Sequence, residues 1–382
     1  MADVGLSTSP VSPSQQTVRR ASWVTRLVAS PRFQSWAARF PLTRRIVRRE
    51  GDAMFDLVAG FCHSQILQAL VKLGIPDMLR TAQLDETALA RAAAVPLARM
   101  RVLLAGGVAI GVLKQGRHGD YGLTVRGAAL AGVPGLAGMI AHHDVLYRDL
   151  ADPVAFFRGE VETELAAFWP YVFGAGAAAD PDAAATYSQL MADSQTLVAA
   201  DTLALADFGQ TRSFMDVGGG TGAFLAAVGQ QYPALALTLF DLPAVVDAAH
   251  DRFDALRMAD RLTVLSGSFR DDPLPAGHDM ISLVRVLYDH DDATVLSLLG
   301  AVFKALPVGG RLLVSEPMTG GASPQKAGDA YFALYCLAMR TGKARSPAEI
   351  AALMAQAGFA QISAPRSRRP FITTVLQGVR QS

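Results

Sequence analysis

From Ser213 onward, the chain alternates short apolar runs with longer stretches in which apolar residues recur at helical spacing. Because parallel strands must be joined by crossover segments, this alternation predicts βαβ units and a parallel sheet. The runs expected to form strands are Phe214–Val217, Leu237–Phe240, Leu262–Leu265, Met280–Val284 and Arg311–Val314. The second part of the chain is therefore expected to be an α/β domain, and an apolar content of 51% is enough to build a large core.

The preceding part has a different order of elements. Apolar residues at helical spacing in residues 54–80 end at Gly74-Ile75-Pro76, which is a helix stop signal. Residues 84–105 predict two short helices, and residues 108–125 predict two short strands around a polar turn. This is the order of a winged helix. Its second helix offers only Arg99 and Arg101 to a DNA groove, so the pattern favours dimerisation and no nucleic-acid partner.

The first 50 residues differ from the rest of the chain in charge. They contain nine arginines against Asp3 and Glu50, a net charge of +7, whereas the whole chain has a net charge of +1. Residues 1–18 are rich in Ser, Pro and Gln and are expected to be disordered. In residues 19–49, arginines alternate with aromatic and aliphatic residues. This basic arm is expected either to lie on an anionic membrane surface or to pack on the next domain or a partner subunit.

The composition disfavours a zinc-binding or disulfide-stabilised protein and a membrane-spanning protein. Cys62 and Cys336 lack the spacing of a zinc site and support no disulfide framework, which fits a reducing cytoplasm. Arg, Asp or Gly interrupts every apolar run before it reaches the length needed to cross a bilayer. We therefore expect neither a metal site nor a membrane-spanning segment.

The first predicted strand runs into a glycine-rich turn, Asp216-Val217-Gly218-Gly219-Gly220-Thr221-Gly222, which precedes a predicted helix. Glycines let the backbone turn tightly and approach a ligand at the helix N-terminus. Asp241 ends the next predicted strand, nineteen residues after Gly222, where a carboxylate can accept hydrogen bonds from both ribose hydroxyls. From these residues alone, a dinucleotide-binding fingerprint and a purely structural turn remain alternatives.

Two further features make this region resemble a class I methyltransferase. An Asp precedes the glycines, as in motif I of that family, and Gly267-Ser268-Phe269 follows the third predicted strand, where the family places residues around adenine. The resemblance implies a Rossmann-like domain that binds S-adenosyl-L-methionine. Tyr187, Met191 and Gln195 match the helix that closes over the methionine end of this cofactor. The cofactor-binding residues implied by the resemblance are Asp216, Gly218, Gly220, Gly222, Asp241, Leu242, Ser268, Phe269, Met191, Gln195 and Arg285.

From Phe55 to Val375, the chain resembles the cation-independent O-methyltransferases. In this family, an α-helical winged-helix domain dimerises and covers the substrate, and a Rossmann-like domain binds the cofactor, so a homodimer is expected. The chain is more closely similar to the carotenoid branch, whose members methylate hydroxyneurosporene or demethylspheroidene. The segments that carry this closer similarity are Ala29–Gln34, Arg285–Asp292, Ser315–Met318 and Ala327–Phe332.

The resemblance implies a domain organisation and a reaction. Residues 1–50 would form the basic arm, residues 51–200 the helical and winged-helix domain, and residues 201–382 the Rossmann-like catalytic domain. The expected reaction moves a methyl group from S-adenosyl-L-methionine to the tertiary 1-hydroxyl of an acyclic carotenoid, in spheroidene or spirilloxanthin formation. The alternatives are methylation of a phenolic or polyketide metabolite and a catalytically inactive winged-helix regulator. The expected location is the cytoplasm, with peripheral attachment of the arm to the photosynthetic (intracytoplasmic) membrane as the alternative.

The chain departs from the family at the catalytic base. Tyr288 occupies the place of the histidine that takes the hydroxyl proton in phenol methyltransferases, and Ala344 replaces a glutamate that flanks this histidine. Tyr288 is expected to orient the hydroxyl or relay its proton. The first candidate base is His290, because imidazole titrates near neutrality, and the alternative is a surface histidine in an acidic turn. His142 and His143 are a second candidate source of a base, or are helix-surface or interface residues. The reaction requires no metal.

Overall fold

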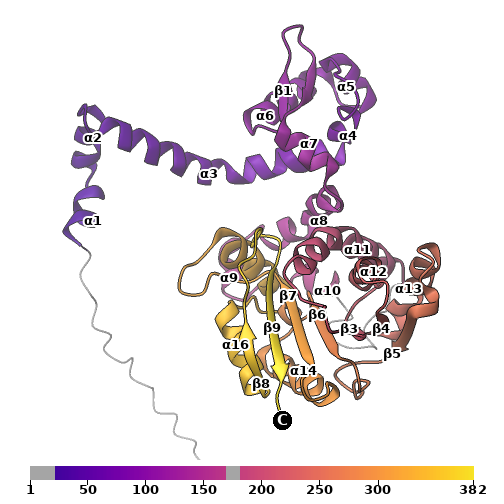
Figure 1. The fold of residues 1–382 in the computed structure, drawn as a ribbon. Helices are drawn as coiled ribbons and strands as arrows, with labels where there is room; N and C mark the ends of the chain where they lie inside the picture. Colours follow the sequence, from indigo (N-terminus) through magenta and orange to yellow (C-terminus); the bar gives the residue numbers. More distant parts are fainter. Residues whose placement is uncertain (1–21, 169–180) are drawn as a thin grey trace, which may run out of the picture. The chain divides into compact units, whose positions relative to one another are not determined.

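The computed structural model describes residues 22–168 and 181–382, without the side chains of residues 167–168, 181–191 and Ala244 (Figure 1). The chain divides into two units, residues 1–66 and residues 67–382. The expected disorder of residues 1–18 and the expected cofactor contacts of Tyr187 and Met191 lie outside what is described.

The first unit consists of helices at the N-terminus. Ser22 caps the first helix by accepting a hydrogen bond from the backbone N–H of Thr25 (3.1 Å), and Pro31 begins the second helix, where its fixed φ is suited to the first turn. The elements are α1 (Trp23–Val28), α2 (Pro31–Arg39) and α3 (Arg44–Lys72), of which the last residues belong to the second unit. The helix expected in residues 54–80 therefore begins earlier, at Arg44.

Within the described residues, α3 is long and apolar enough to cross a membrane by length and composition alone. This differs from the expectation based on uninterrupted apolar runs, because Asp52 and Asp56 break a run without making the helix polar on average. The same test is passed by helices that are covered by protein, so α3 by itself is weak evidence for a membrane span.

The second unit begins with the predicted winged helix. Asp85 caps one of its helices by accepting hydrogen bonds from the backbone N–H groups of Thr87 (2.9 Å) and Ala88 (2.7 Å). The elements are α4 (Ile75–Met78), α5 (Glu86–Ala92), α6 (Leu97–Ala109), β1 (Leu113–Gln115), β2 (Tyr121–Leu123) and α7 (Val125–Gly132). The two strands form an antiparallel hairpin, and the expected order of helix, helix and hairpin is confirmed.

A layer of helices connects the winged helix to the sheet. Its elements are α8 (Leu136–Asp149), α9 (Pro153–Phe157), α10 (Glu164–Phe168), α11 (Pro181–Leu203), the π-helical η4 (Lys326–Phe332) and α15 (Ala333–Met339). Buried Leu146 of α8 and Leu165 of α10 pack with Tyr335 and Met339 of α15. This packing places α8 against a segment that lies nearly 200 residues later in the chain.

The rest of the second unit is a seven-stranded sheet in the order β5-β4-β3-β6-β7-β9-β8 (Figure 1). The first five strands in this order are parallel, and β9 runs antiparallel to both of its neighbours. The strands are β3 (Ser213–Val217), β4 (Ala236–Asp241), β5 (Leu262–Ser266), β6 (Met280–Val284), β7 (Arg311–Glu316), β8 (Phe359–Ser363) and β9 (Thr374–Arg380). The five expected strands are all present, whereas β8 and β9 were not among them.

Helices cover both faces of this sheet. Alternate residues of β3 enter different apolar clusters, since Phe214 packs with Phe224 and Phe253, whereas Met215 packs with Leu298 and its neighbours. The covering elements are α12 (Ala223–Gln231), α13 (Pro243–Ala255), α14 (Asp292–Ala305) and α16 (Pro347–Gln356), with short turns η2 (Ala259–Arg261) and η3 (Leu287–Asp289). The strand order reverses between β3 and β6, and ligands of such α/β sheets bind beyond the carboxyl ends of the strands at this point.

Candidate functional site

The glycine-rich turn after β3 has a backbone that only glycine adopts easily. Gly218, Gly220 and Gly222 have φ angles of 70°, 60° and 72°. A Cβ on Gly218 would lie 2.8 Å from Cγ2 of Val286, whereas a Cβ on Gly220 would meet no atom within 4 Å. The turn is therefore closely packed at Gly218 and open at Gly220, where a ligand can approach the backbone.

Replacing Gly220 with alanine is expected to weaken cofactor binding about tenfold, because a side chain at positive φ costs about 1–2 kcal/mol and the new methyl group enters the open space. Isothermal titration calorimetry measures this change. Gly119→Ala is a matched control, because Gly119 also has positive φ (84°) and no neighbour within 4 Å, but lies in the hairpin of the winged helix. Equal cofactor affinity in the two variants would contradict the assignment of Gly220 to the cofactor site.

Two carboxylates flank this turn, the buried Asp216 and the partly buried Asp241. Asp241 accepts hydrogen bonds from the backbone N–H groups of Gly220 (2.6 Å) and Leu242 (2.7 Å). Asp216 accepts one from the Ser282 hydroxyl (2.5 Å), and its second oxygen, Oδ2, is buried without a partner among the described residues. Burial raises the pKa of Asp216 to about 7 and also raises the pKa of Asp241. The unsatisfied oxygen makes Asp216 an acceptor for a ligand that donates hydrogen bonds.

A pocket lies over the carboxyl ends of β3, β4, β5 and β6. Of the predicted cofactor-binding residues, those that line it are Gln195, Asp216, Gly218, Gly220, Asp241, Leu242, Ser268, Phe269 and Arg285. Gly222 does not line the pocket and is instead the N-cap residue of α12. Arg270, Asp289 and Val245 line the pocket although the sequence did not single them out for this role. Asp289 lies between the candidate residues Tyr288 and His290, and this position was the sequence signal that could have identified it as a pocket residue.

Arg285 has an unusual backbone conformation at the wall of this pocket. It directly follows β6 and has a φ of 59°, which is costly for a residue with a side chain. Its guanidinium donates a hydrogen bond to the Ser194 hydroxyl of α11 (2.7 Å). Arg285 therefore ties the helix that covers the pocket to the strand ends that form its floor.

His290 lies at the side of the pocket formed by residues that follow β5. Its ring is buried and meets the Phe269 ring edge-on, with the ring centroids 5.3 Å apart. The Arg270 guanidinium donates a hydrogen bond to Nδ1 of His290 (3.0 Å), because a guanidinium cannot accept one. Burial, with Arg270 as the second cause, lowers the pKa of His290 to about 4. The neutral ring then carries its proton on Nε2 and has no free lone pair, so this geometry does not support His290 as the base.

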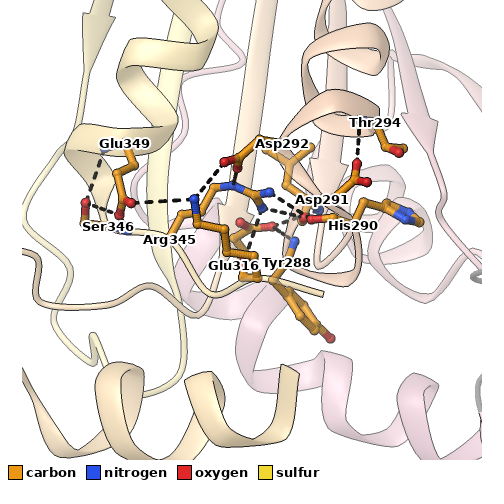
Figure 2. Close-up of polar contacts among 11 residues, drawn as sticks. Tyr288, His290, Asp291, Asp292, Thr294, Glu316, Arg345, Ser346 and Glu349 are labelled. Atoms are coloured by element: carbon orange, nitrogen blue, oxygen red, sulfur yellow. Dashed lines mark hydrogen bonds and ion pairs between the residues drawn. The ribbon is translucent and has the colours of Figure 1, made fainter. Parts of the chain in front are cut away.

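The turn that contains Tyr288 is held by a buried arginine (Figure 2). Arg345 is 0% exposed and donates hydrogen bonds to Asp292 (2.7 Å) and to the backbone carbonyls of Leu287 (2.9 Å) and His290 (2.8 Å). From the other side, Oε2 of Glu316 accepts hydrogen bonds from the backbone N–H groups of Leu287 and Tyr288. In Figure 2, the rings of Tyr288 and His290 point away from Arg345. Arg345 and Glu316 therefore position the turn without contacting either ring.

His142 and His143 do not line the cofactor pocket, and each is paired with a tyrosine. Nε2 of His143 lies 2.6 Å from the Tyr331 hydroxyl, and Nε2 of His142 lies 3.1 Å from the Tyr335 hydroxyl. Burial lowers the pKa of both histidines, for His142 to about 4. Among the residues described, no group of three or more His, Cys, Asp or Glu is arranged to hold a metal ion.

The fold and the site together define a class I methyltransferase with an N-terminal winged helix. The O-methyltransferase domain family matches residues 147–360, and the O-methyltransferase dimerisation domain matches residues 55–132. The chain belongs to the O-methyltransferase family.

Named relatives and solved structures agree with this membership. The chain is 55% identical to a demethylspheroidene O-methyltransferase of Cereibacter sphaeroides over 94% of both chains. It is 50% identical to the protein of the same name from Rhodobacter capsulatus, over 97% of this chain and 92% of the relative. Human N-acetylserotonin methyltransferase has the same fold, with a TM-score of 0.75 at 24% identity over 87% of this chain and 98% of that chain. A calicheamicin-biosynthesis methyltransferase in its SAH-bound form matches with a TM-score of 0.71 at 27% identity, covering 87% of this chain and 98% of its own.

Proposed function

We propose that this protein transfers a methyl group from S-adenosyl-L-methionine to the tertiary 1-hydroxyl of an acyclic carotenoid. The observation that carries this proposal is the 55% identity to a demethylspheroidene O-methyltransferase over 94% of both chains. Relatives named for aromatic substrates, such as a naphthoate methyltransferase at 28% identity and acetylserotonin methyltransferases at 31%, are more distant. The altered position Tyr288 agrees with a substrate that is not a phenol.

The residues of the pocket fit the cofactor. Asp241 lies where its oxygens can accept hydrogen bonds from a ribose, and the free Oδ2 of Asp216 suits a ligand that donates hydrogen bonds. Phe269 supplies an apolar surface for adenine, and the open side of Gly220 admits the ligand to the backbone. When bound, the cofactor supplies a methyl group on a positively charged sulfur. The task of the protein is to align the hydroxyl with this methyl group and to remove its proton.

The test is methyl transfer from labelled S-adenosyl-L-methionine to a detergent-dispersed 1-hydroxycarotenoid, with a catechol in parallel. We expect product from the carotenoid. Product from the catechol alone would assign the chain to the phenolic alternative. Tight cofactor binding without turnover of either compound, together with DNA binding at moderate salt, would instead support the regulator.

The apolar face of α3 from Phe55 onward is assigned here to a second copy of the chain. Phe55, Leu57, Val58 and Phe61 are between 64% and 72% exposed, and all lie within the match to the dimerisation domain. Exposed apolar residues in such a domain are expected to be covered by the partner in a homodimer. Sedimentation equilibrium tests the oligomeric state.

The described part of the basic arm, residues 22–49, precedes the dimerisation match, and we assign it to a membrane surface. Trp23, Trp36 and Leu42 are 69%, 52% and 79% exposed. The same segment contains seven arginines and no acidic residue. Arg48 pairs with Asp52 and Arg49 with Glu50, and the remaining surplus of positive charge beside exposed aromatic residues is suited to an interface of anionic lipids. Peripheral attachment would bring the enzyme to a substrate that is soluble in membranes.

Replacing Arg44 and Arg45 with glutamine is expected to lower binding to phosphatidylglycerol vesicles about 30-fold, because each arginine near such a surface contributes about 1 kcal/mol. Vesicle co-sedimentation with the full chain measures this binding. The control is Arg366→Gln with Arg368→Gln, which removes two exposed arginines of the second unit. Equal binding of the unaltered chain to neutral phosphatidylcholine vesicles, or no binding to either, would reject the membrane assignment.

A further inference from the structure

Two histidine–tyrosine pairs join α8 to the segment formed by η4 and α15. One pair is His143 with Tyr331, whose ring centroids lie 5.6 Å apart and whose Nε2 and hydroxyl lie 2.6 Å apart. The other pair is His142 with Tyr335, at 3.1 Å. The pairs have the same chemistry but unequal geometry, because the shorter contact belongs to His143. The His143–Tyr331 pair is therefore the candidate for a catalytic role, and the adjacent His142–Tyr335 pair is a nearly matched control.

The position of Tyr331 distinguishes its pair from the other. Tyr331 lies in η4, a π-helical segment, and such segments are rare and often occur at functional sites. The charge of Arg285 acts on the Tyr331 hydroxyl, and Arg285 lines the cofactor pocket. Arg285 joins the end of β6 to α11 at the wall of the pocket, so Tyr331 lies within electrostatic reach of this part of the wall although it does not itself line the cofactor pocket.

His290 lies on another side of the pocket. It contacts Phe269 and Arg270, which follow β5, whereas Arg285 follows β6 on the far side of β3 and β4. If Phe269 faces adenine, His290 is close to the adenine end of the cofactor. The reacting methyl group is far from that end. The proton acceptor is therefore to be sought near Arg285.

We propose that Tyr331 and His143 form the proton relay that replaces the missing family base; this inference depends on the proposed methyl transfer. As the hydroxyl oxygen forms its bond to the methyl carbon, the carbon–sulfur bond breaks and its electron pair stays on sulfur. The hydroxyl proton passes to the oxygen of Tyr331, and the proton of Tyr331 passes to Nε2 of His143. His143 then releases this proton to water. Tyr331 is the catalytic residue, and His143 acts through it.

The ionisation states of the pair suit this role. Burial raises the pKa of Tyr331 to about 12, so its hydroxyl stays protonated and can donate to His143. Burial lowers the pKa of His143 below its usual 6.5, so the ring is neutral at physiological pH and can accept a proton. The other titratable or charged groups near the pair are His142 and Tyr147 on α8, Tyr335 on α15 and Arg285. The relay is expected to work above the pKa of His143 and to fail as the pH falls through it.

The experiment compares Tyr331→Phe and His143→Gln with Tyr335→Phe and His142→Gln in the full chain. We expect kcat to fall about 100-fold in the first two variants, the range for a lost proton-transfer group, with unchanged cofactor affinity. In the other two variants, kcat should stay within about threefold of the unaltered chain. The unaltered chain should lose activity as the pH falls through the lowered pKa of His143, and His143→Gln should lack this decline.

Three results would overturn the relay. One is an equal loss of kcat in both pairs, which would indicate a structural role for the helix contact. A second is an unchanged acid decline in His143→Gln. Failure of the unaltered chain to methylate the carotenoid is a separate result, because it would contradict the proposed function before any variant is compared. A loss of cofactor affinity in Tyr331→Phe would also contradict the relay, since it would place Tyr331 in cofactor binding.

Discussion

Replacement of Asp241 by alanine is expected to raise the dissociation constant for S-adenosyl-L-methionine about a thousandfold. The carboxylate accepts hydrogen bonds from Gly220 and Leu242 at 2.6 and 2.7 Å, so it organises the glycine-rich turn as well as facing the ligand. Hydrogen bonds to a charged acceptor contribute about 1.5–3 kcal/mol each, and losing the two expected from the ribose hydroxyls amounts to about 4 kcal/mol. Isothermal titration calorimetry with the unlabelled cofactor measures the change.

Two further variants define the role of Asp241. Asp241→Asn retains one acceptor oxygen and should show an intermediate loss of affinity. Asp247→Ala removes an exposed carboxylate from α13, close in sequence, and should leave the affinity unchanged. A loss of less than tenfold in Asp241→Ala would mean that the ribose is held elsewhere.

Replacement of Arg345 by methionine is expected to lower the free energy of unfolding by about 3–5 kcal/mol, because each buried carbonyl that loses its hydrogen-bond donor costs about 1–3 kcal/mol. Arg345 has a fully buried side chain, and methionine fills part of its volume without donating hydrogen bonds. The carbonyls of Leu287 and His290 would then lose the donor that satisfies them (Figure 2). Urea unfolding followed by circular dichroism measures the loss.

The comparison for this variant is Arg366→Met, which changes an exposed arginine and should alter stability by less than about 0.5 kcal/mol. Arg345→Lys should also be strongly destabilising, because a lysine cannot reproduce the several directed hydrogen bonds of the guanidinium. If Arg345→Met were as stable as the unaltered chain, the turn at Tyr288 would be held by Glu316 alone.

Local signals were enough to predict the strands and the cofactor turn. Strand β3, the glycines after it and Asp241 at the end of β4 follow one another at short spacing. A tight turn needs glycine at specific positions, so its position can be predicted from such a stretch of sequence. Strands β8 and β9 were not predicted. β8 has the sequence FAQIS, which lacks the apolar run that marked the five predicted strands, and β9 finds its place by pairing antiparallel with β7, which is far away in the sequence.

The catalytic base shows most clearly which features depend on the sequence alone and which depend on tertiary contacts. The sequence by itself determined that the family histidine is absent, that Tyr288 stands in its place, and that His290, His142 and His143 are the nearby candidates. Only the tertiary structure decided what each candidate contacts. Arg270 occupies Nδ1 of His290, and Tyr331 lies against His143 although 188 residues separate them. A proton acceptor depends on which lone pair is free and which donor faces it, and these are properties of packed side chains rather than of residue spacing.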